Sequence, residues 1–245
     1  MDEVIRRWSA FLEKIERAYD GLLAEGCVGC LALAGTRGTA AMSNAWHGVR
    51  AEVFALSDKI ERAWREQVEA SFTAAGVEGE ALQREEERGR ALGQRLLHGL
   101  ERREIELFGE VAEHLLADAR DEARERVFSC TQCGARLQLP PSIFSSIHVC
   151  CEYCRAVTTF EPGTRARLVE HFCAHHLGQR AALEQWEALE AAHRLRRQTR
   201  GESSEVLQQI ASAKRAYWQA YFSARAELVP ASKERIELEV SARLR

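Results

Sequence analysis

Four cysteines in two Cys-x-x-Cys pairs form the clearest chemical pattern in this sequence. The pairs are "CTQC" at 130–133 and "CEYC" at 151–154, with 17 residues between them. The two cysteines of such a pair can occupy neighbouring corners of a tetrahedral metal site. Two pairs at this separation are typical of a four-cysteine zinc site. The spacing therefore favours metal binding over free thiols or disulfides.

The segment around the first pair matches the segment around the second. "FSCTQCGA" (128–135) and "VCCEYCRA" (149–156) share an apolar residue, two cysteines and a final alanine in one register. In this register Cys150 falls opposite a serine, so we predict that it lies outside the metal shell. Arg155 falls opposite Gly134, at a position after the turn where a left-handed backbone suits glycine better than arginine. The predicted metal ligands are Cys130, Cys133, Cys151 and Cys154.

On these motifs, residues 127–162 resemble the zinc-ribbon family. The resemblance implies two cysteine knuckles on the hairpins of a small three-stranded sheet, with one structural Zn²⁺ on the four cysteines. Four thiolates close the coordination shell, whereas a catalytic zinc keeps a position open for water or substrate. Zinc ribbons occur in transcription and ribosomal proteins, enzymes and scaffolds, so the resemblance indicates metal and local fold but not function. In so small a module the metal supplies much of the folding free energy, on the order of 10 kcal/mol.

A third Cys-x-x-Cys pair, Cys27 and Cys30 in "GCVGC", follows a helical pattern. It is either a redox dithiol, half of a second metal site, or two small buried residues at a helix end. A thioredoxin-like dithiol needs a strand–helix setting that is missing here, and no further pair completes a second site. We favour buried packing residues.

The stretch "EHFCAHH" (170–176) holds two further candidate pairs. His171 and His175 are four residues apart and share a helical face, as two metal ligands would. Cys173 and His176 are three residues apart, as a thiol and its general base could be. No third ligand or partner residue accompanies either pair, so we favour surface or packed histidines.

Helical periodicity dominates the chain outside residues 127–163. We expect a helix ended by Gly26 and a second one marked by apolar residues from 46 to 68 and ending near "AAGVEG" (74–79). We expect a third over 80–126 that is kinked or broken at its glycines. "ARLQLP" and "AVTTF" read as short strands, and the tail from Pro230 reads as a helix. The predicted fold is mainly α: an antiparallel bundle of long helices with an inserted small β zinc-ribbon module. Residues 1–126 and 164–245 form its helical segments, the second packing on the first, and residues 127–163 form the ribbon.

Composition limits the partners and the compartment. The net charge is −3, and residues of both charges are interspersed along the chain. The chain as a whole therefore has no electrostatic footprint for nucleic acid or anionic membrane. The longest apolar run, "CVGCLALAG", is too short for a membrane span. Eight cysteines without a secretion signal favour a reducing compartment, so we expect a cytoplasmic protein. Basic residues are mostly arginine, which suggests a bacterial, GC-rich genome.

These observations favour a non-enzymatic zinc-binding protein that acts as a protein-interaction or scaffolding module through its helices and its ribbon. The expected partner is another protein or a second copy of the chain. One alternative is a nucleic-acid-associated regulator that uses the ribbon strands and their arginines. The other is an enzyme with a site in the helical bundle, built on Cys173 or the histidine pair. The arginines near the ribbon are Arg136, Arg155, Arg165 and Arg167.

Overall fold

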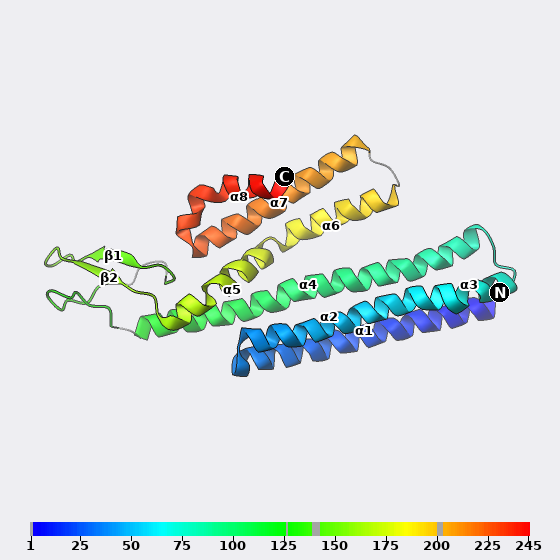
Figure 1. Cartoon of the computed structure of the whole chain (residues 1–245), viewed down its shortest axis with the longest axis horizontal. Helices are drawn as coiled ribbons and strands as arrows, with labels where there is room; N and C mark the ends of the chain where they lie inside the picture. Colours follow the sequence, from blue (N-terminus) through cyan, green and yellow to red (C-terminus); the bar gives the residue numbers. More distant parts are fainter. Residues whose placement is uncertain (1, 126, 139–142, 200–202) are drawn as a thin grey trace. The chain divides into compact units, whose positions relative to one another are not determined.

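The structure is a computed structural model that describes residues 2–125, 127–138, 143–199 and 203–245. Helices make up most of these residues, and the described strands form one small sheet next to the paired cysteines (Figure 1). The mainly α fold with a small β element is therefore confirmed. The chain divides into two compact units, 1–107 and 108–245, and the division falls inside the long helix α4 (Glu80–Glu125).

The first unit is built on a hairpin of two long helices. Helix α1 (Asp2–Arg37) and helix α2 (Thr39–Ala63) pack against each other in antiparallel directions (Figure 1). Only Gly38 separates them, in the left-handed region at a φ of 84°. A π-helix η1 (Trp64–Val68) and the short helix α3 (Glu69–Ala74) extend α2, and the N-terminal part of α4 belongs to the same unit. Its largest fully buried side chains are Trp46, Phe72, Met42, Ile60, Leu100 and Leu107.

The predicted helix breaks at glycine were wrong. Helix α1 continues through Gly26, where a Cβ would lie 2.6 Å from Cγ2 of Val49 on α2. Helix α4 likewise runs unbroken, and a Cβ on Gly89 would lie 2.7 Å from the ring of Trp8. These glycines let neighbouring helices approach closely, and tertiary packing overrides their low helix propensity.

In the second unit, helix α7 is the central element. It packs on α5, on α6 and on α8. The tail beyond Pro230 is helical, as expected, first as the 3₁₀-helix η2 and then as α8. The bounds are α5 (Thr164–Ala181), α6 (Leu183–Gln198), α7 (Ser204–Leu228), η2 (Pro230–Arg235) and α8 (Ile236–Leu244).

The small sheet consists of β1 (Ile147–Cys150) and β2 (Val157–Phe160), paired antiparallel with Cys150 opposite Val157. The strand predicted at "AVTTF" is thus present, and β1 is one that the sequence patterns did not predict. At "ARLQLP" the described residues form an isolated bridge, between Ser129 and Arg136, rather than a third strand. Residues 139 and 140 of that segment lie outside the described part of the chain.

Helix α1 is relevant to the prediction that the chain has no membrane-spanning segment. A window of 18 residues in α1 has a mean hydropathy of 1.2. By length and composition α1 is therefore apolar enough to cross a membrane, the one such helix among the described residues. Core helices of soluble proteins and N-terminal signal sequences meet the same criteria. The absence of a span stays a prediction.

Candidate metal centre

The two cysteine knuckles, residues 130–135 and 151–156, share one pattern of backbone hydrogen bonds. In the first, the amide of Cys130 donates to the carbonyl of Ala135 at 2.8 Å, and the amide of Gly134 donates back to the carbonyl of Cys130 at 2.9 Å. In the second, Cys151 takes the place of Cys130, and Ala156 and Arg155 make the equivalent bonds, both at 2.9 Å. The internal sequence match therefore reflects two copies of one turn.

The residue after each pair has a left-handed backbone. Gly134 has a φ of 73° and Arg155 a φ of 63°, and Arg155 is the one non-glycine residue with positive φ in the described part of the chain. A left-handed conformation costs an L-residue about 1–2 kcal/mol. The turn thus imposes on Arg155 the strain that the sequence comparison with Gly134 anticipated.

The turns bring the four predicted ligands together. Their sulfur atoms all lie within 4.8 Å of one another. Sγ of Cys130 lies 3.5 Å from Sγ of Cys154, and Sγ of Cys133 lies 3.7 Å from Sγ of Cys151. A tetrahedron with metal–sulfur bonds of 2.3 Å has sulfur atoms about 3.8 Å apart. The spacing of these thiols therefore fits a single tetrahedral metal ion with two ligands from each knuckle.

The electrostatics of the cluster favour a cation among the sulfurs. Backbone amides of Cys133 and Gln132 lower the pKa of Cys130 to about 6. For Cys154 a hydrogen bond from Ala156 acts in the same direction, but hydrogen bonds with the neighbouring thiols and desolvation outweigh it and raise its pKa to about 12. One thiolate forms readily in this cluster, and its neighbours then oppose further ionisation. A divalent cation removes that opposition, because it stabilises all four thiolates together.

Cys150 lies outside the group of four. Its side chain is exposed on β1, and its sulfur donates to the carbonyl of Arg155 at 3.5 Å. Inside the module, Cys130 and Cys151 form a small core with Leu137. That core is flanked by the partly buried side chains of Phe128, Ala135, Val149 and Ala156. A core with so few apolar residues is too small to stabilise the module by itself, which is consistent with a fold that depends on a bound metal.

The third pair lies inside helix α1 rather than at a helix end. Both Cys27 and Cys30 are buried, and neither belongs to the one candidate metal-binding group found among the described residues. Sγ of Cys27 accepts a hydrogen bond from Nε of Arg103 at 3.1 Å. Sequence reasoning missed this contact, because Arg103 is 76 positions away and only the packing of α4 on α1 brings it there.

The histidines of α5 make contacts within the second unit. Nδ1 of His175 lies 2.8 Å from the hydroxyl of Tyr221, and Nδ1 of His176 lies 3.1 Å from Oε1 of Gln179. Burial, and next the nearby His175, lower the pKa of His176 to about 4. Cys173 is fully buried and donates to the carbonyl of Ala112 at 3.4 Å. The structure therefore gives Cys173 and His176 separate partners, not each other.

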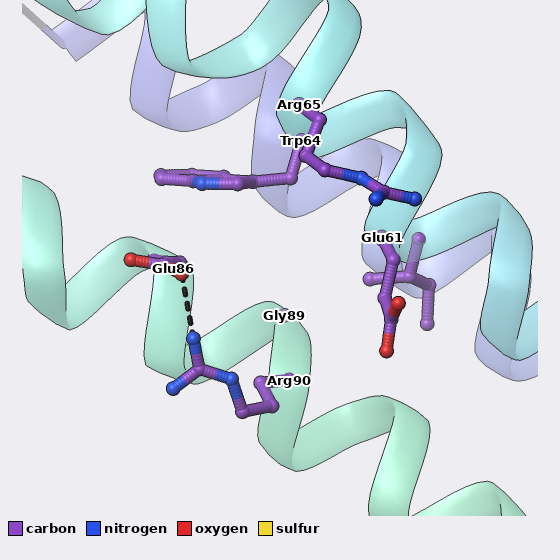
Figure 2. Close-up of a pocket in the computed structure, with 7 residues that line it drawn as sticks. Glu61, Trp64, Arg65, Glu86, Gly89 and Arg90 are labelled. Carbon is purple, nitrogen blue, oxygen red and sulfur yellow. Dashed lines mark hydrogen bonds and ion pairs between the residues drawn. The ribbon is translucent and has the colours of Figure 1, made fainter.

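A shallow cleft in the first unit lies between α2 and α4 (Figure 2). Its volume is about 200 Å³, and Trp64 and Ile60 supply its apolar part. Trp64 opens the π-helix η1, an element often found at functional sites. Glu86 and Arg90 form an ion pair of 2.6 Å at its edge. The sequence carried no signal for this cleft, and its other lining residues are Glu61, Arg65 and Gly89.

Comparisons with protein-family models, with curated proteins and with solved structures find no match to this chain.

Proposed function

We propose that Cys130, Cys133, Cys151 and Cys154 hold one structural Zn²⁺ and that residues 127–162 are a zinc ribbon. The observation that carries this proposal is the set of four sulfur atoms within 4.8 Å of one another. The matched knuckle hydrogen bonds support it, because both turns present two thiolates in the same way. Four soft sulfur ligands in tetrahedral spacing select zinc or iron over harder cations.

Elemental analysis of the purified full-length protein tests the metal. We expect one zinc per chain, and none after Cys151→Ser. Cys150→Ser is the matched control, because it changes the adjacent cysteine, which lies outside the group, and should keep the zinc. The ligand assignment is wrong if Cys150→Ser abolishes binding and Cys151→Ser does not. Iron in place of zinc would contradict the choice of ion.

We further propose that the protein is a non-enzymatic interaction or scaffolding module and that the ribbon presents its contact surface. Four thiolates leave no metal position open for a substrate. Tyr153, between the cysteines of the second knuckle, is 80% exposed, and Val157 on β2 is 62% exposed. Large apolar side chains exposed on one small module favour a protein partner, because burying them against another protein is favourable.

A paired comparison of variants tests the interaction surface. We expect Tyr153→Ser with Val157→Thr to retain the zinc and to abolish cross-linking to the partner that the wild type captures in cells. Leu238→Ser on α8 removes a side chain that is 64% exposed, and it should leave that cross-link intact. Equal loss in both variants, or in neither, would contradict a contact surface on the ribbon. If the wild type self-associates, and the ribbon variant loses this self-association while Leu238→Ser keeps it, the partner is a second copy of the chain.

Nucleic-acid binding is a second candidate function, favoured by two arginines of the knuckles. Arg136 and Arg155 are exposed, and neither makes an ion pair with a residue in the described part of the chain. Free guanidinium groups bind phosphate well. If this function holds, Arg136→Ala with Arg155→Ala should weaken binding to a labelled oligonucleotide and flatten its salt dependence. No binding of RNA or DNA by the wild type at low salt would exclude it.

A further inference from the structure

A second cleft of the first unit lies between α1 and the segment formed by the end of α2, η1 and α3. Its volume is about 240 Å³, against about 200 Å³ for the cleft in Figure 2. Trp8 lines the second cleft and Trp64 lines the first, and their ring centroids lie 5.6 Å apart. Pockets for drug-sized ligands usually have volumes of about 300–1,000 Å³. The second cleft therefore suits a smaller molecule.

The body of this cleft is apolar. Val4, Trp8 and Phe11 line it from α1, and Ala63 and Val68 line it from α2 and η1. The rings of Trp8 and Phe11 stack with their centroids 5.4 Å apart and their planes 12° apart. Such a lining favours the hydrocarbon part of a ligand, because contact with it removes apolar surface from water.

One cation lies at the cleft. Arg7 is the one charged residue among the described residues that line it, and it makes no ion pair or hydrogen bond with any residue that the structure describes. Its neighbour Arg6 lies outside the lining and pairs with Glu3 at 3.5 Å. The hydroxyl of Ser71 already donates to the carbonyl of Gln67 at 2.7 Å. The guanidinium of Arg7 is therefore the group that can bind the polar end of a ligand, and its planar fork matches a carboxylate.

The cleft in Figure 2 differs in its charges. Arg90 there is paired with Glu86 at 2.6 Å and with Glu87 at 2.8 Å. Glu61 and Arg65 lie at the same cleft, so an anion would meet carboxylates as well as cations (Figure 2). Of the two clefts, the second is the one that combines an apolar lining with a single uncompensated charge.

We propose that the second cleft binds a small apolar carboxylate, with the carboxylate on Arg7 and the hydrocarbon part against Val4, Phe11 and Val68. The cleft is too small for a helix of a protein partner, whose diameter is about 10 Å, so the ligand is a small molecule. All four candidate metal ligands lie in the second unit, whereas this cleft lies in the first. Binding at the cleft is therefore independent of the proposed metal centre.

Titration of the isotope-labelled full-length protein with octanoate, followed by amide chemical shifts, tests this site. We expect saturable shifts concentrated in residues 4–11 and 63–71. Octylammonium has the same chain and the opposite charge, and it should bind at least about 10-fold more weakly because Arg7 repels it. Butanoate should also bind at least about 10-fold more weakly, because its shorter chain buries less apolar surface. No binding of octanoate below its micelle concentration, shifts centred elsewhere, or equal affinities for octanoate and octylammonium would overturn the proposal.

Variants at Arg7 test the charge contact separately from the apolar one. Arg7→Met should weaken octanoate binding about 10-fold and leave octanol binding unchanged, and Arg7→Lys should weaken it less because the charge is kept. Arg6→Met is the matched control, since it removes the same charge one residue away and outside the lining, and it should keep the affinity. Arg7 is exposed, so its substitution should leave the fold intact, which circular dichroism checks. Unchanged affinity in Arg7→Met, or equal weakening in both methionine variants, overturns the role of Arg7.

Discussion

The chain uses one four-residue motif in two unlike settings. In the module, Cys130 and Cys133 sit in a turn, where the amide of Gln132 is free to donate to Sγ of Cys130 at 3.4 Å. In α1, Cys27 and Cys30 sit inside a continuous helix whose amides already bond carbonyls four residues back. Their sulfurs take partners from other helices instead. The backbone around a Cys-x-x-Cys pair, more than the pair itself, therefore decides what its sulfurs can bind.

Removal of the metal should give the largest difference between the two settings, because it should affect the module and leave α1 unchanged. We expect a chelator, or Cys151→Ser, to unfold the module, because on the order of 10 kcal/mol of metal-binding free energy is lost. Amide hydrogen exchange should rise over 128–137 and 147–160 and stay unchanged over 20–50 in α1 and α2. Unchanged protection in the module after complete metal removal would contradict a metal-dependent fold.

Acid should act on the helices through a different group, His176 on α5. Its pKa of about 4 lies below the unfolded value of about 6.5, so its contribution to stability is complete above pH 6.5 and is lost as the pH falls toward 4. The loss should be no more than about 3 kcal/mol, roughly 2 of them by pH 5. Denaturant unfolding of a metal-free sample at pH 7 and pH 5 measures it. His176→Phe should remove most of this dependence, with a remainder from His175, whose pKa burial also lowers. His171→Gln, at an exposed position, should keep it.

Removal of one sulfur from the helical pair should cost stability without changing the metal content. We expect Cys27→Ala to lower the free energy of unfolding by about 1–2 kcal/mol, because the guanidinium of Arg103 loses its acceptor. Elemental analysis should still find one metal ion per chain. Cys133→Ser is the counterpart in the module and should lose the metal. A loss of metal in Cys27→Ala would break the distinction between the two settings.

The left-handed position after each knuckle should respond in opposite directions to two substitutions. Gly134→Ala should destabilise the module by about 1 kcal/mol, and Arg155→Gly should stabilise it by a similar amount, because only glycine adopts this backbone without strain. The resistance of the bound metal to a competing chelator measures both changes. The same sign for both variants would show that the side chains, not the backbone, set the effect.

A glycine inside the helical pair should behave in the reverse way, with the smallest effect. Gly29 lies within α1, and apart from its neighbours and the backbone of its own helix no atom lies within 4 Å of where its Cβ would be. Gly29→Ala should therefore raise the free energy of unfolding by up to about 1 kcal/mol, since alanine has the higher helix propensity. Thermal unfolding followed by circular dichroism measures the change. A lower melting temperature would show that Gly29 does not sit in a regular helix.

Local patterns predicted much of the architecture. Periodicity located the segments of α4 and α7, and the β-branched run at 157–160 marked β2, because each pattern reflects which face of one element is buried. The failures share one cause. Gly26 was read as a break and Gly89 as a kink or a break, yet each supports a close approach to a residue far away in sequence, Val49 or Trp8. The sequence shows only that glycine has a low helix propensity, whereas the residue that packs against it is known only from the fold.

The two knuckles could be recognised from local sequence, since two copies of one turn fix the positions of two sulfurs each. The strain at Arg155 was likewise readable from the sequence, through the match with Gly134. The contact of Arg103 with Cys27 and the cleft that Trp64 lines beside α4 depend instead on tertiary packing. Turn geometry depends on neighbours within a few residues, whereas those contacts depend on how helices far apart in the chain pack, which no local pattern encodes.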